Sequence, residues 1–461
     1  MLKQSDPEVY AILKKEEKRQ QDKLSLIASE NCFSPSVREA VGSVFSHKYS
    51  EGNVGERYYE GNENIDQLEQ LAIDRACQLF KVPKDWTANV QALSGSNANL
   101  AVYLALMEAG DTLMSMYLPD GGHLSHGWSF EPDESKRKAD LVSGSLVYLG
   151  GKRKVHLTSR LYKVVQYKTE PQTKLFNYDE VEKIAVKYKP RLIITGGTAY
   201  PRNIDYRRMR EVADRVGALY LADIAHEAGL VAGRAVRSPV GVADVVTMTT
   251  HKTLRAGRGA IILADKGLIG KINRGLLPGL QGGPHNHNIA GITVGLGEAL
   301  RPEFTKYAQQ VVKNAKHLAK ALEKQGFKIV TKGTDKHLLL VDLNDQPILG
   351  KNFAFILDEA GLVTNATTLP WDSSPPRNPA GLRLGTPWVT TRGMKEKEMD
   401  IIASWIKQVM NIASSWSKLT SQELEEKAGA SMELKNIARA VSKLGRNFMD
   451  FPKKGMVARA I

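Results

Sequence analysis

The stretch RLIITGGTAYPRNIDYRRMREVADRVGALYLAD, residues 191–223, decides the fold of this chain of 461 residues. Its apolar start, residues 191–195, predicts a strand, and residues 206–216 predict an amphipathic helix that Gly217 ends. Residues 218–223 then predict a second strand. Because a parallel pair of strands needs a crossover connection of this length, the stretch predicts a parallel βαβ unit.

Two further apolar stretches continue the same pattern. DVVTMTT, residues 244–250, and GAIILAD, residues 259–265, are short and rich in strand-forming side chains. We therefore expect an α/β fold whose large domain holds a mixed, mostly parallel sheet. Open sheets of this kind bind ligands outside the carboxyl ends of their strands. Asp223 falls at such an end, so its carboxylate is placed for chemistry.

The rest of the chain indicates a second, smaller domain. A long amphipathic helix is predicted near residue 304, and Gly326 ends it. Its apolar side chains recur at steps of three and four residues: Phe304, Tyr307, Val311, Ala315, Leu318 and Leu322. The strand HLLLVDL and a helical segment at 352–360 follow, which suits an α+β domain. We expect a large domain at residues 25–288 and a small C-terminal domain at residues 289–461.

The first residues predict an N-terminal helical arm, residues 1–24. Asp6 followed by Pro7 is typical of a helix start, and the charged helix runs to about Lys23. Because isolated helices of fewer than about 12–15 residues are marginal in water, we expect the arm to dock on a larger body. A neighbouring subunit is one candidate for that body.

Composition narrows the class of protein. Lys and Arg number 64 against 50 Asp and Glu, and the formal net charge of +14 favours anionic ligands or nucleic acid. Cys32 and Cys77 lie far apart without a redox or metal spacing, which suits a reducing compartment. The N-terminus lacks the apolar core of a secretory signal, and no apolar run of about 18 residues occurs. We therefore expect a cytoplasmic protein that does not span a membrane.

The strongest local signal is VTMTTHKTL, residues 246–254, where an apolar strand runs into a turn rich in hydroxyl groups. Thr249 and Lys252 lie in this turn. A lysine here can reach a carbonyl and form a Schiff base, provided that burial and nearby positive charge lower the pKa of its amine. The alternative is a solvent-exposed loop lysine.

The motif DIAH, residues 223–226, offers a partner for a ring cofactor. A pyridine ring accepts electrons when its nitrogen stays protonated, and a buried carboxylate beside the nitrogen keeps it so. Asp223 lies where such a partner must lie. Its alternative role is to cap a helix or turn.

A phosphate site is predicted in LSGSNANLAVYLALMEAG. Ser94, Gly95 and Ser96 precede a helix that Gly110 is expected to end. The free backbone N–H groups and the positive end of that helix suit a phosphate monoester, although simple capping by Ser and Asn is the alternative. The motif is neither a Walker loop nor a dinucleotide fingerprint.

Histidines occur in pairs in GGHLSHG and GGPHNHN. His123 and His126 form the first pair, and His285 and His287 form the second. A metal site needs three or four converging ligands with a suitable spacing, so we expect no metal. The flat imidazole of His123 is better suited to stack on a planar cofactor, with a structural histidine as the alternative.

Nine motifs in order carry a family resemblance through nearly the whole chain: LIASEN, YSEGNVGERYYEGNENID, SGSNAN, GGHLSHG, GGTAYPRNIDY, YLADIAHEAGLVA, TMTTHKTLR, GLQGGPH and GLRLGTPWVTTRG. With them the chain resembles serine hydroxymethyltransferase (glycine hydroxymethyltransferase), a family of fold-type I pyridoxal-phosphate enzymes. The resemblance implies that pyridoxal 5'-phosphate is bound covalently to Lys252. It also implies that Asp223 pairs with the ring nitrogen and that His123 stacks on the ring.

The resemblance assigns further cofactor ligands by position. It implies that Ser94, Gly95, Ser96 and His251 hold the phosphate, and that Thr198 and His226 lie near the phenolic oxygen. It implies that Gly282, Gly283 and Tyr49 add phosphate contacts from the neighbouring subunit of a homodimer. Shared active sites of this kind make a homodimer the expected assembly.

The resemblance also assigns the substrate side. It implies that Ser29 and Arg383 bind the amino acid carboxylate, for which a guanidinium is well shaped. Tyr58 and Tyr59 would border the reacting carbon. Arg258 keeps the positive charge that the family has after the lysine, and we expect it to help bind the substrate. Glu51 would be the acid–base carboxylate, a role typically worth about 10²–10⁴-fold in rate.

The implied reaction is reversible transfer of the hydroxymethyl carbon of L-serine to tetrahydrofolate, giving glycine and 5,10-methylenetetrahydrofolate through an external aldimine. A folate-independent threonine or allo-threonine aldolase is the alternative, because both reactions break a Cα–Cβ bond in a β-hydroxy amino acid. The segment from Glu51 to Tyr59 favours the folate enzyme.

Two basic triplets, residues 136–138 and 152–154, lie in a segment at 131–174 that has no clear period. We interpret this segment as an irregular excursion from the sheet. No recognised nucleic-acid motif accompanies the triplets, so a solvated surface is the simpler interpretation and nucleic acid is not an expected partner. A further hypothesis is that these bases attract the glutamate tail of folate.

Overall fold

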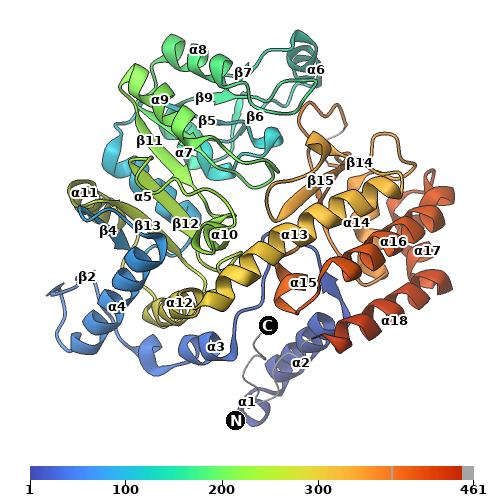
Figure 1. Ribbon diagram of the computed structural model, residues 1–461, viewed down its shortest axis with the longest axis horizontal. Helices are drawn as coiled ribbons and strands as arrows, with labels where there is room; N and C mark the ends of the chain where they lie inside the picture. The colour runs from blue at the N-terminus through green and yellow to red at the C-terminus, as the bar shows by residue number, and fades with distance from the viewer. Residues whose placement is uncertain (375–376, 449–461) are drawn as a thin grey trace. The chain divides into compact units, whose positions relative to one another are not determined.

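The computed structural model describes residues 1–374 and 377–448. They form two compact units, and Figure 1 colours them along the chain. The terminal unit consists of Met1–Glu30, Gln310–Leu369 and the described residues from Ser374 onward. The central unit consists of Asn31–Gln309 and Pro370–Ser373.

Along the chain, the terminal unit first gives way to the central unit between residues 30 and 31. The sequence suggests a boundary six residues earlier, between residues 24 and 25. Strand β1 (Leu24–Ser25) explains the difference, because it pairs in parallel with β16 (Leu362–Val363). This pairing joins the residues that follow the N-terminal arm to the terminal unit.

The second changeover lies at 309/310, inside helix α13 (Pro302–Lys324), whereas the sequence suggests a boundary at 288/289. Helix α12 (Asn286–Ala299) packs on α4 (Glu63–Phe80) and so remains in the central unit. The sequence placed the boundary at the start of a new amphipathic pattern, but the compact unit extends one helix further.

An eight-stranded sheet forms the centre of the central unit. Its strands, in spatial order, are β4 (Trp86–Asn89), β13 (Ala260–Asp265), β12 (Val245–Thr249), β11 (Leu219–Asp223), β10 (Leu192–Thr195), β5 (Thr112–Met116), β9 (Lys163–Tyr167) and β7 (Val147–Tyr148). The pairs from β12 to β9 are parallel, while β13, β4 and β7 pair antiparallel. The predicted mixed, mostly parallel sheet is therefore confirmed.

The βαβ unit that opened the sequence argument is also confirmed. Strand β10 leads to helix α9 (Tyr206–Val216), whose N-cap Asp205 accepts hydrogen bonds from two backbone N–H groups. Gly217 ends the helix at a φ of 67°, a conformation that favours glycine. Strand β11 follows and pairs with β10 in parallel. Asp223 is its last residue, as predicted.

Helices α5 (Gly95–Leu106) and α11 (Lys266–Leu276) cover one face of this sheet. Leu192 and Ile194 of β10 join their apolar core, so Ile193 between them points to the opposite face. Helix α9 packs on β10 and β11. The layers leave the carboxyl ends of the parallel strands free to carry polar side chains.

The interpretation of residues 131–174 as an irregular excursion is wrong. The segment contains α6 (Glu134–Ser143), β7, β8 (Arg153–Lys154), α7 (Leu157–Leu161) and β9. Strand β9 pairs with β5 over five residues and buries Val164 and Val165. Helix α6 gave no periodic signal because none of its residues is buried.

The terminal unit contains a four-stranded antiparallel sheet in the order β14 (Lys328–Ile329), β15 (Leu338–Asp342), β18 (Gly381–Gly385) and β17 (Asn365–Thr367). Its core takes side chains from α14 (Gly350–Glu359), α16 (Glu396–Ala413), α17 (Ser421–Ala430) and α18 (Met432–Asn447). The predicted α+β organisation of the C-terminal part is thus observed.

The predicted N-terminal helix is α2 (Pro7–Asp22), and the Asp6 side chain accepts from the backbone N–H of Val9 at 3.0 Å. It packs on α18, where Arg446 donates to Asp22 at 2.6 Å. Its apolar side chains stay outside this contact: Val9, Ile12 and Leu13 are 47%, 65% and 42% exposed. Among residues 1–374 and 377–448, no helix has both the length and the apolar character to cross a bilayer.

Candidate active site

Asp223 forms the floor of a polar cluster at the carboxyl ends of the parallel strands. Its Oδ2 accepts from Nδ2 of Asn99 at 2.8 Å and faces Nε2 of His126 at 3.0 Å, and its Oδ1 accepts from the N–H of Ala225 at 2.9 Å. Burial alone would raise the pKa of this carboxyl group. The hydrogen bond and charge of His126, with those of His123 and Asn99, outweigh burial and hold the pKa of Asp223 well below its usual range.

Asn99 connects this carboxylate to the neighbouring strands. It lies on α5, is fully buried, and also donates to Oγ of Ser125 at 3.0 Å. Its Oδ1 accepts from Oγ1 of Thr247 on β12 at 2.7 Å. With both ends of its amide engaged, Asn99 fixes the orientation of Asp223.

His123 lies in the turn after β5. Its Nδ1 accepts from the backbone N–H of Ser125 at 3.2 Å. Burial, followed by the charges of His126 and Lys252, lowers the pKa of His123 to about 4. The imidazole is therefore neutral at physiological pH, with Nδ1 as an acceptor and the proton on Nε2.

The His123 turn approaches the backbone after β10 very closely. The N–H of Thr198 donates to the carbonyl of Gly121 at 2.6 Å, and its Oγ1 donates to the carbonyl of Gly122 at 2.9 Å. A Cβ on Gly121 would lie 2.5 Å from the backbone nitrogen of Tyr200, so only glycine fits. Thr198 thereby holds the turn that carries His123.

Lys252 lies in the turn after β12. Oγ1 of Thr249 donates to the carbonyl of Ala225 at 2.9 Å, which joins this turn to the residues after Asp223. Burial, followed by the charges of Arg258 and Lys252, lowers the pKa of His251 to about 3.

The N-terminus of α5 lies against the same turn and fits a phosphate. Ser94 is the N-cap, and its Oγ accepts from the N–H of Asn97 at 3.3 Å. A Cβ on Gly95 would lie 2.8 Å from Cγ2 of Thr249, so glycine is required for this contact. Nδ1 of His251 is buried without a hydrogen-bond partner among the described residues. A phosphate oxygen would satisfy it.

Helix α5 ends earlier than the sequence suggested. Its last residue is Leu106, and Met107 already has an extended backbone with φ −133°. Gly110, which was expected to end the helix, instead lies in the following turn with a φ of 91°. The cofactor site is unaffected because it lies at the other end of the helix.

His123, His126 and Asp223 are the single group of three metal-type ligands among residues 1–374 and 377–448. Their ligand atoms all lie within 4.8 Å of one another. The His126 Nε2 and Asp223 Oδ2 atoms are 3.0 Å apart and are joined by a hydrogen bond. His123 Nδ1 is also engaged by Ser125. Two of the three groups are thus joined to each other by a hydrogen bond, and the third accepts one from the backbone.

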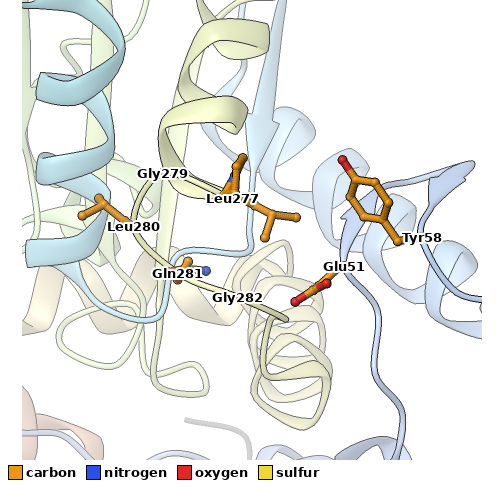
Figure 2. A pocket seen from close by; sticks show the side chains of 8 residues that line it. Glu51, Tyr58, Leu277, Gly279, Leu280, Gln281 and Gly282 are labelled. Carbon is orange, nitrogen blue, oxygen red and sulfur yellow. The ribbon is translucent and has the colours of Figure 1, made fainter.

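A second group of predicted residues lines a pocket of about 520 Å³ in the same unit. Glu51 and Tyr58 form one wall and residues 277–282 form the other, and Figure 2 shows the Glu51 side chain beside Gly282. A Cβ on Gly282 would lie 3.4 Å from Oε1 of Glu51. Tyr58 is 77% exposed, so this wall faces solvent.

Tyr49, Tyr59 and Gly283 lie beside this group, since a Cβ on Gly282 would also lie 3.8 Å from the Tyr49 hydroxyl oxygen. The rings of Tyr49 and Tyr59 meet edge to face with centroids 5.4 Å apart. A Cβ on Gly283 would lie 3.2 Å from the Tyr49 ring. The residues expected from the neighbouring subunit thus gather together in one chain.

The backbone around Glu51 is held by a buried ion-pair network. Arg57 donates to the carbonyl of Gly52 at 2.6 Å, to Asp66 at 2.8 Å and to Glu69 at 2.7 Å. Gln91 donates to the same carbonyl of Gly52 at 3.0 Å and to Glu69 at 2.7 Å. Sequence reasoning missed Arg57 and Gln91 as supports, although Arg57 lies within a quoted motif.

The two predicted carboxylate ligands lie in the terminal unit. Arg383 is in β18, its Nε donates to Oδ1 of Asn365 at 3.2 Å, and burial lowers its pKa to about 10. Ser29 lies in the turn after Leu26, whose carbonyl accepts from the N–H of Gly385 at 2.7 Å. Arg383 therefore stays cationic at neutral pH.

The central unit brings together the predicted cofactor residues from four strand ends and one helix start: Ser94, Gly95, Ser96, His123, Thr198, Asp223, His226, Thr249, His251 and Lys252. His226 is buried, and its carbonyl accepts from Oγ1 of Thr253 at 2.9 Å. Arg258 is exposed, and its charge contributes to the lowered pKa of His251. Asn99 and His126 were missed as partners of Asp223, although both lie in motifs already quoted.

Comparison with known proteins matches residues 2–406 to the family model described as serine hydroxymethyltransferase. A serine hydroxymethyltransferase of Sorangium cellulosum is 47% identical over 408 residues, which cover 88% of this chain and 90% of that protein. One of Acidothermus cellulolyticus is 44% identical over 447 residues, covering 97% and 96%. One of Acidobacterium capsulatum is 46% identical over 418 residues, covering 91% of each. The chain therefore belongs to the serine hydroxymethyltransferase family.

Proposed function

We propose that this protein transfers the hydroxymethyl carbon of L-serine to tetrahydrofolate, giving glycine and 5,10-methylenetetrahydrofolate, with pyridoxal 5'-phosphate on Lys252. Family membership supports the reaction. The observation that carries the cofactor assignment is the buried Asp223 carboxylate, kept anionic at a strand end beside the turn that holds Lys252.

Pyridoxal phosphate, when bound, supplies an electron sink for the pair of electrons left on the amino acid's α-carbon. Asp223 would keep the ring nitrogen protonated, which makes that sink effective. Neutral His123 would offer a flat face to the ring. Thr198 and His226 would lie near the phenolic oxygen.

The start of α5 would bind the phosphate. Ser94, Gly95 and Ser96 present backbone N–H groups at a positive helix end. His251 is neutral, and its buried Nδ1 can donate to a phosphate oxygen when that nitrogen is the protonated one. These groups would hold the phosphate of the cofactor beside the turn that carries Lys252.

The amino acid carboxylate would bind to Arg383 and Ser29. A guanidinium that remains charged at neutral pH holds a carboxylate in a fixed plane, which orients the bond that breaks. Glu51 would move the proton of the serine hydroxyl, and Tyr58 and Tyr59 would border the reacting carbon. Arg258 would add positive charge on the substrate side.

A homodimer would complete each site. Glu51 and Gly282 line one pocket of the central unit, with Tyr49 and Gly283 beside them, and we propose that these residues serve the Lys252 cluster of the partner subunit. The exposed apolar side chains of α2 give a surface that an assembly would cover. Both cysteines, Cys32 and Cys77, are free, which supports a cytoplasmic location.

The test is a serine-cleavage assay on the purified protein, with and without tetrahydrofolate, in which 5,10-methylenetetrahydrofolate is detected by mass spectrometry. We expect glycine and the methylene product in equal amounts when tetrahydrofolate is present. Cleavage of allo-threonine with no tetrahydrofolate-dependent cleavage of serine would instead identify a folate-independent aldolase.

A further inference from the structure

An asparagine outside the predicted site holds the turn that carries Lys252. Nδ2 of Asn31 donates to the backbone carbonyl of Lys252 at 2.9 Å and to the hydroxyl of Tyr307 at 2.8 Å. Its Oδ1 accepts from the N–H of Cys32 at 2.9 Å. These partners fix the orientation of the amide, since a carbonyl can only accept a hydrogen bond.

Tyr307 extends the clamp by one residue. Its hydroxyl donates to the carbonyl of Thr253 at 3.3 Å, so two successive carbonyls of the lysine turn are held from one side. The guanidinium carbon of Arg255 lies 4.2 Å from the centre of the Tyr307 ring. Arg255 has a φ of 60°, a conformation unfavourable for any residue except glycine, and this stacking contact helps to hold it.

The other side of the turn is held as well. Oγ1 of Thr253 donates to the carbonyl of His226 at 2.9 Å and accepts from the N–H of Gly229 at 2.9 Å. A Cβ on Gly229 would lie 2.1 Å from the carbonyl oxygen of Thr253, so the two backbones are in direct contact. The main chain of Lys252 is therefore fixed between the Asn31–Tyr307 pair and the residues after Asp223.

We propose that Asn31 is a positioning residue that sets where the Lys252 amine meets the aldehyde carbon of pyridoxal phosphate. The inference rests on the cofactor assigned under the proposed function. In the step concerned, the amine nitrogen forms a C=N bond to the aldehyde carbon. The aldehyde C=O bond breaks, and its oxygen leaves as water with the two protons of the amine. A lysine stem is flexible, so a displaced backbone misplaces the nitrogen, and an error of about 1 Å can cost up to about 10²-fold in rate.

The test follows cofactor binding to the apo-protein by absorbance, with two ligands. Pyridoxal phosphate can bond to Lys252, whereas pyridoxamine phosphate has no aldehyde and reports non-covalent binding alone. Asn31→Ala removes the clamp, and Asn31→Asp keeps its shape but replaces the donor with a carboxylate. Tyr307→Phe removes one hydroxyl and keeps the ring under Arg255.

A matched control comes from Asn314 in the terminal unit. It is fully buried, and its Nδ2 also donates to a hydroxyl and a carbonyl, those of Thr390 and Met394. Asn314→Ala should lower the thermal unfolding temperature without changing the rate at which pyridoxal phosphate bonds to Lys252. It therefore measures the loss of a buried amide as such.

We expect Asn31→Ala and Asn31→Asp to slow formation of the Lys252 bond about tenfold or more, with a smaller effect for Tyr307→Phe. The dissociation constant of pyridoxamine phosphate should stay within about twofold of wild type. Bond formation at the wild-type rate in both Asn31 variants would overturn the proposal. So would a slowing matched by an equal loss of pyridoxamine phosphate affinity.

Serine cleavage by the same wild-type preparation separates this inference from the proposed function. A wild-type protein that bonds pyridoxal phosphate at Lys252 but does not cleave serine refutes the proposed function and leaves the Asn31 comparison valid. An active wild type with unaffected Asn31 variants refutes the positioning role alone.

Discussion

Nε2 of His126 lies 3.0 Å from Oδ2 of Asp223, and both side chains are buried at the carboxyl end of β11. His126 therefore donates a hydrogen bond to the carboxylate that we assign to the ring nitrogen of the cofactor. Asn99 donates to the same oxygen at 2.8 Å. The electron-accepting power of the cofactor would thus depend on two residues that do not themselves reach the substrate.

Replacing His126 should weaken catalysis through Asp223. His126→Ala is expected to lower kcat about 10–10²-fold, because partners behind a site residue typically have effects of this size. Loss of the His126 hydrogen bond should also raise the pKa of Asp223, so the acid side of the kcat–pH profile should move to higher pH. His317→Ala is the control, since it breaks a histidine–aspartate pair with Asp400 at the surface. An unchanged pH profile in His126→Ala would contradict this role.

Asp120 gives a second pH-dependent prediction, because its pKa is raised whereas the pKa of Asp223 is lowered. Its Oδ2 accepts from the N–H and Oγ1 of Thr169, but burial raises its pKa to about 6, despite these bonds and the charges of Lys168 and Lys174. A raised carboxyl pKa favours the folded state at low pH, and this stability is lost as the pH rises through about 6.

Asp120→Asn keeps an oxygen for Thr169 and cannot ionise. Relative to wild type, the free energy of unfolding of the variant should therefore improve by about 2–3 kcal/mol between pH 4 and pH 8. Denaturant unfolding at the two pH values measures the change, and comparing them cancels any cost that does not depend on pH. A constant difference would show that Asp120 is not buried as an anion at pH 8.

Gly95 gives a steric prediction at the phosphate site. A Cβ there would lie 2.8 Å from Cγ2 of Thr249, so Gly95→Ala should push the start of α5 from the lysine turn. We expect the affinity for pyridoxal phosphate to fall about tenfold, measured by equilibrium dialysis. Gly270→Ala in α11 is the matched control, because a Cβ at this helical glycine meets nothing within 4 Å. Equal affinities in both variants would refute a phosphate site at this helix end.

Glu51 tests the acid–base assignment. Glu51→Gln keeps the shape of the side chain beside Gly282 but removes its proton-transfer capacity. Serine cleavage with tetrahydrofolate should fall about 10²–10⁴-fold, while allo-threonine cleavage should change little. Parallel rate measurements with the two substrates decide the matter. Equal losses would mean that Glu51 serves both reactions and has no special role with folate.

The structure brings the two basic triplets together. Strand β8 pairs with β6 (Ser129–Phe130), where Arg153 lies opposite Phe130. The guanidinium carbon of Arg137 lies 5.1 Å from the centre of the same Phe130 ring. Strand β6 begins three residues after His126, so the basic residues that gather at Phe130 lie close in sequence to the turn that carries His123.

If this surface attracts the glutamate tail of folate, reversing the charges of residues 152–154 to Glu should reduce the preference for pentaglutamate over monoglutamate about tenfold. Binding of the two folates is compared by titration calorimetry at low and physiological salt. The same reversal at three exposed lysines of α13 is the control: Lys313, Lys316 and Lys320. An unchanged preference together with loss of a salt-dependent gel shift would point to nucleic acid instead.

Much of the central sheet could be predicted because its signals are local. Residues 191–223 combine apolar strands, an amphipathic helix and a glycine stop, and each agrees with the final fold. Helix α6 could not be predicted, because it buries none of its residues and has no apolar period. The pairing of β1 with β16 could not be predicted either, since it joins residues that are more than 300 positions apart.

The candidate site likewise contains residues that could be predicted from the sequence and residues that could not. Asp223 and Lys252 could be placed at strand ends because strand patterns lead directly to them. The bond from Asn99 to Asp223 could not be foreseen, since it joins a helix and a strand across 124 positions. The clamp from Asn31 to Lys252 spans 221 positions and likewise depends on tertiary packing. Local patterns therefore identify candidate residues, whereas their supporting partners require the fold.

The covalent bond between Lys252 and the coenzyme is tested most directly by reducing the purified protein with sodium borohydride and mapping the modified peptide by mass spectrometry. The account predicts one phosphopyridoxyl group per chain, on the peptide that contains THKTL. A modified lysine elsewhere, or a chain that takes up no coenzyme, would contradict it.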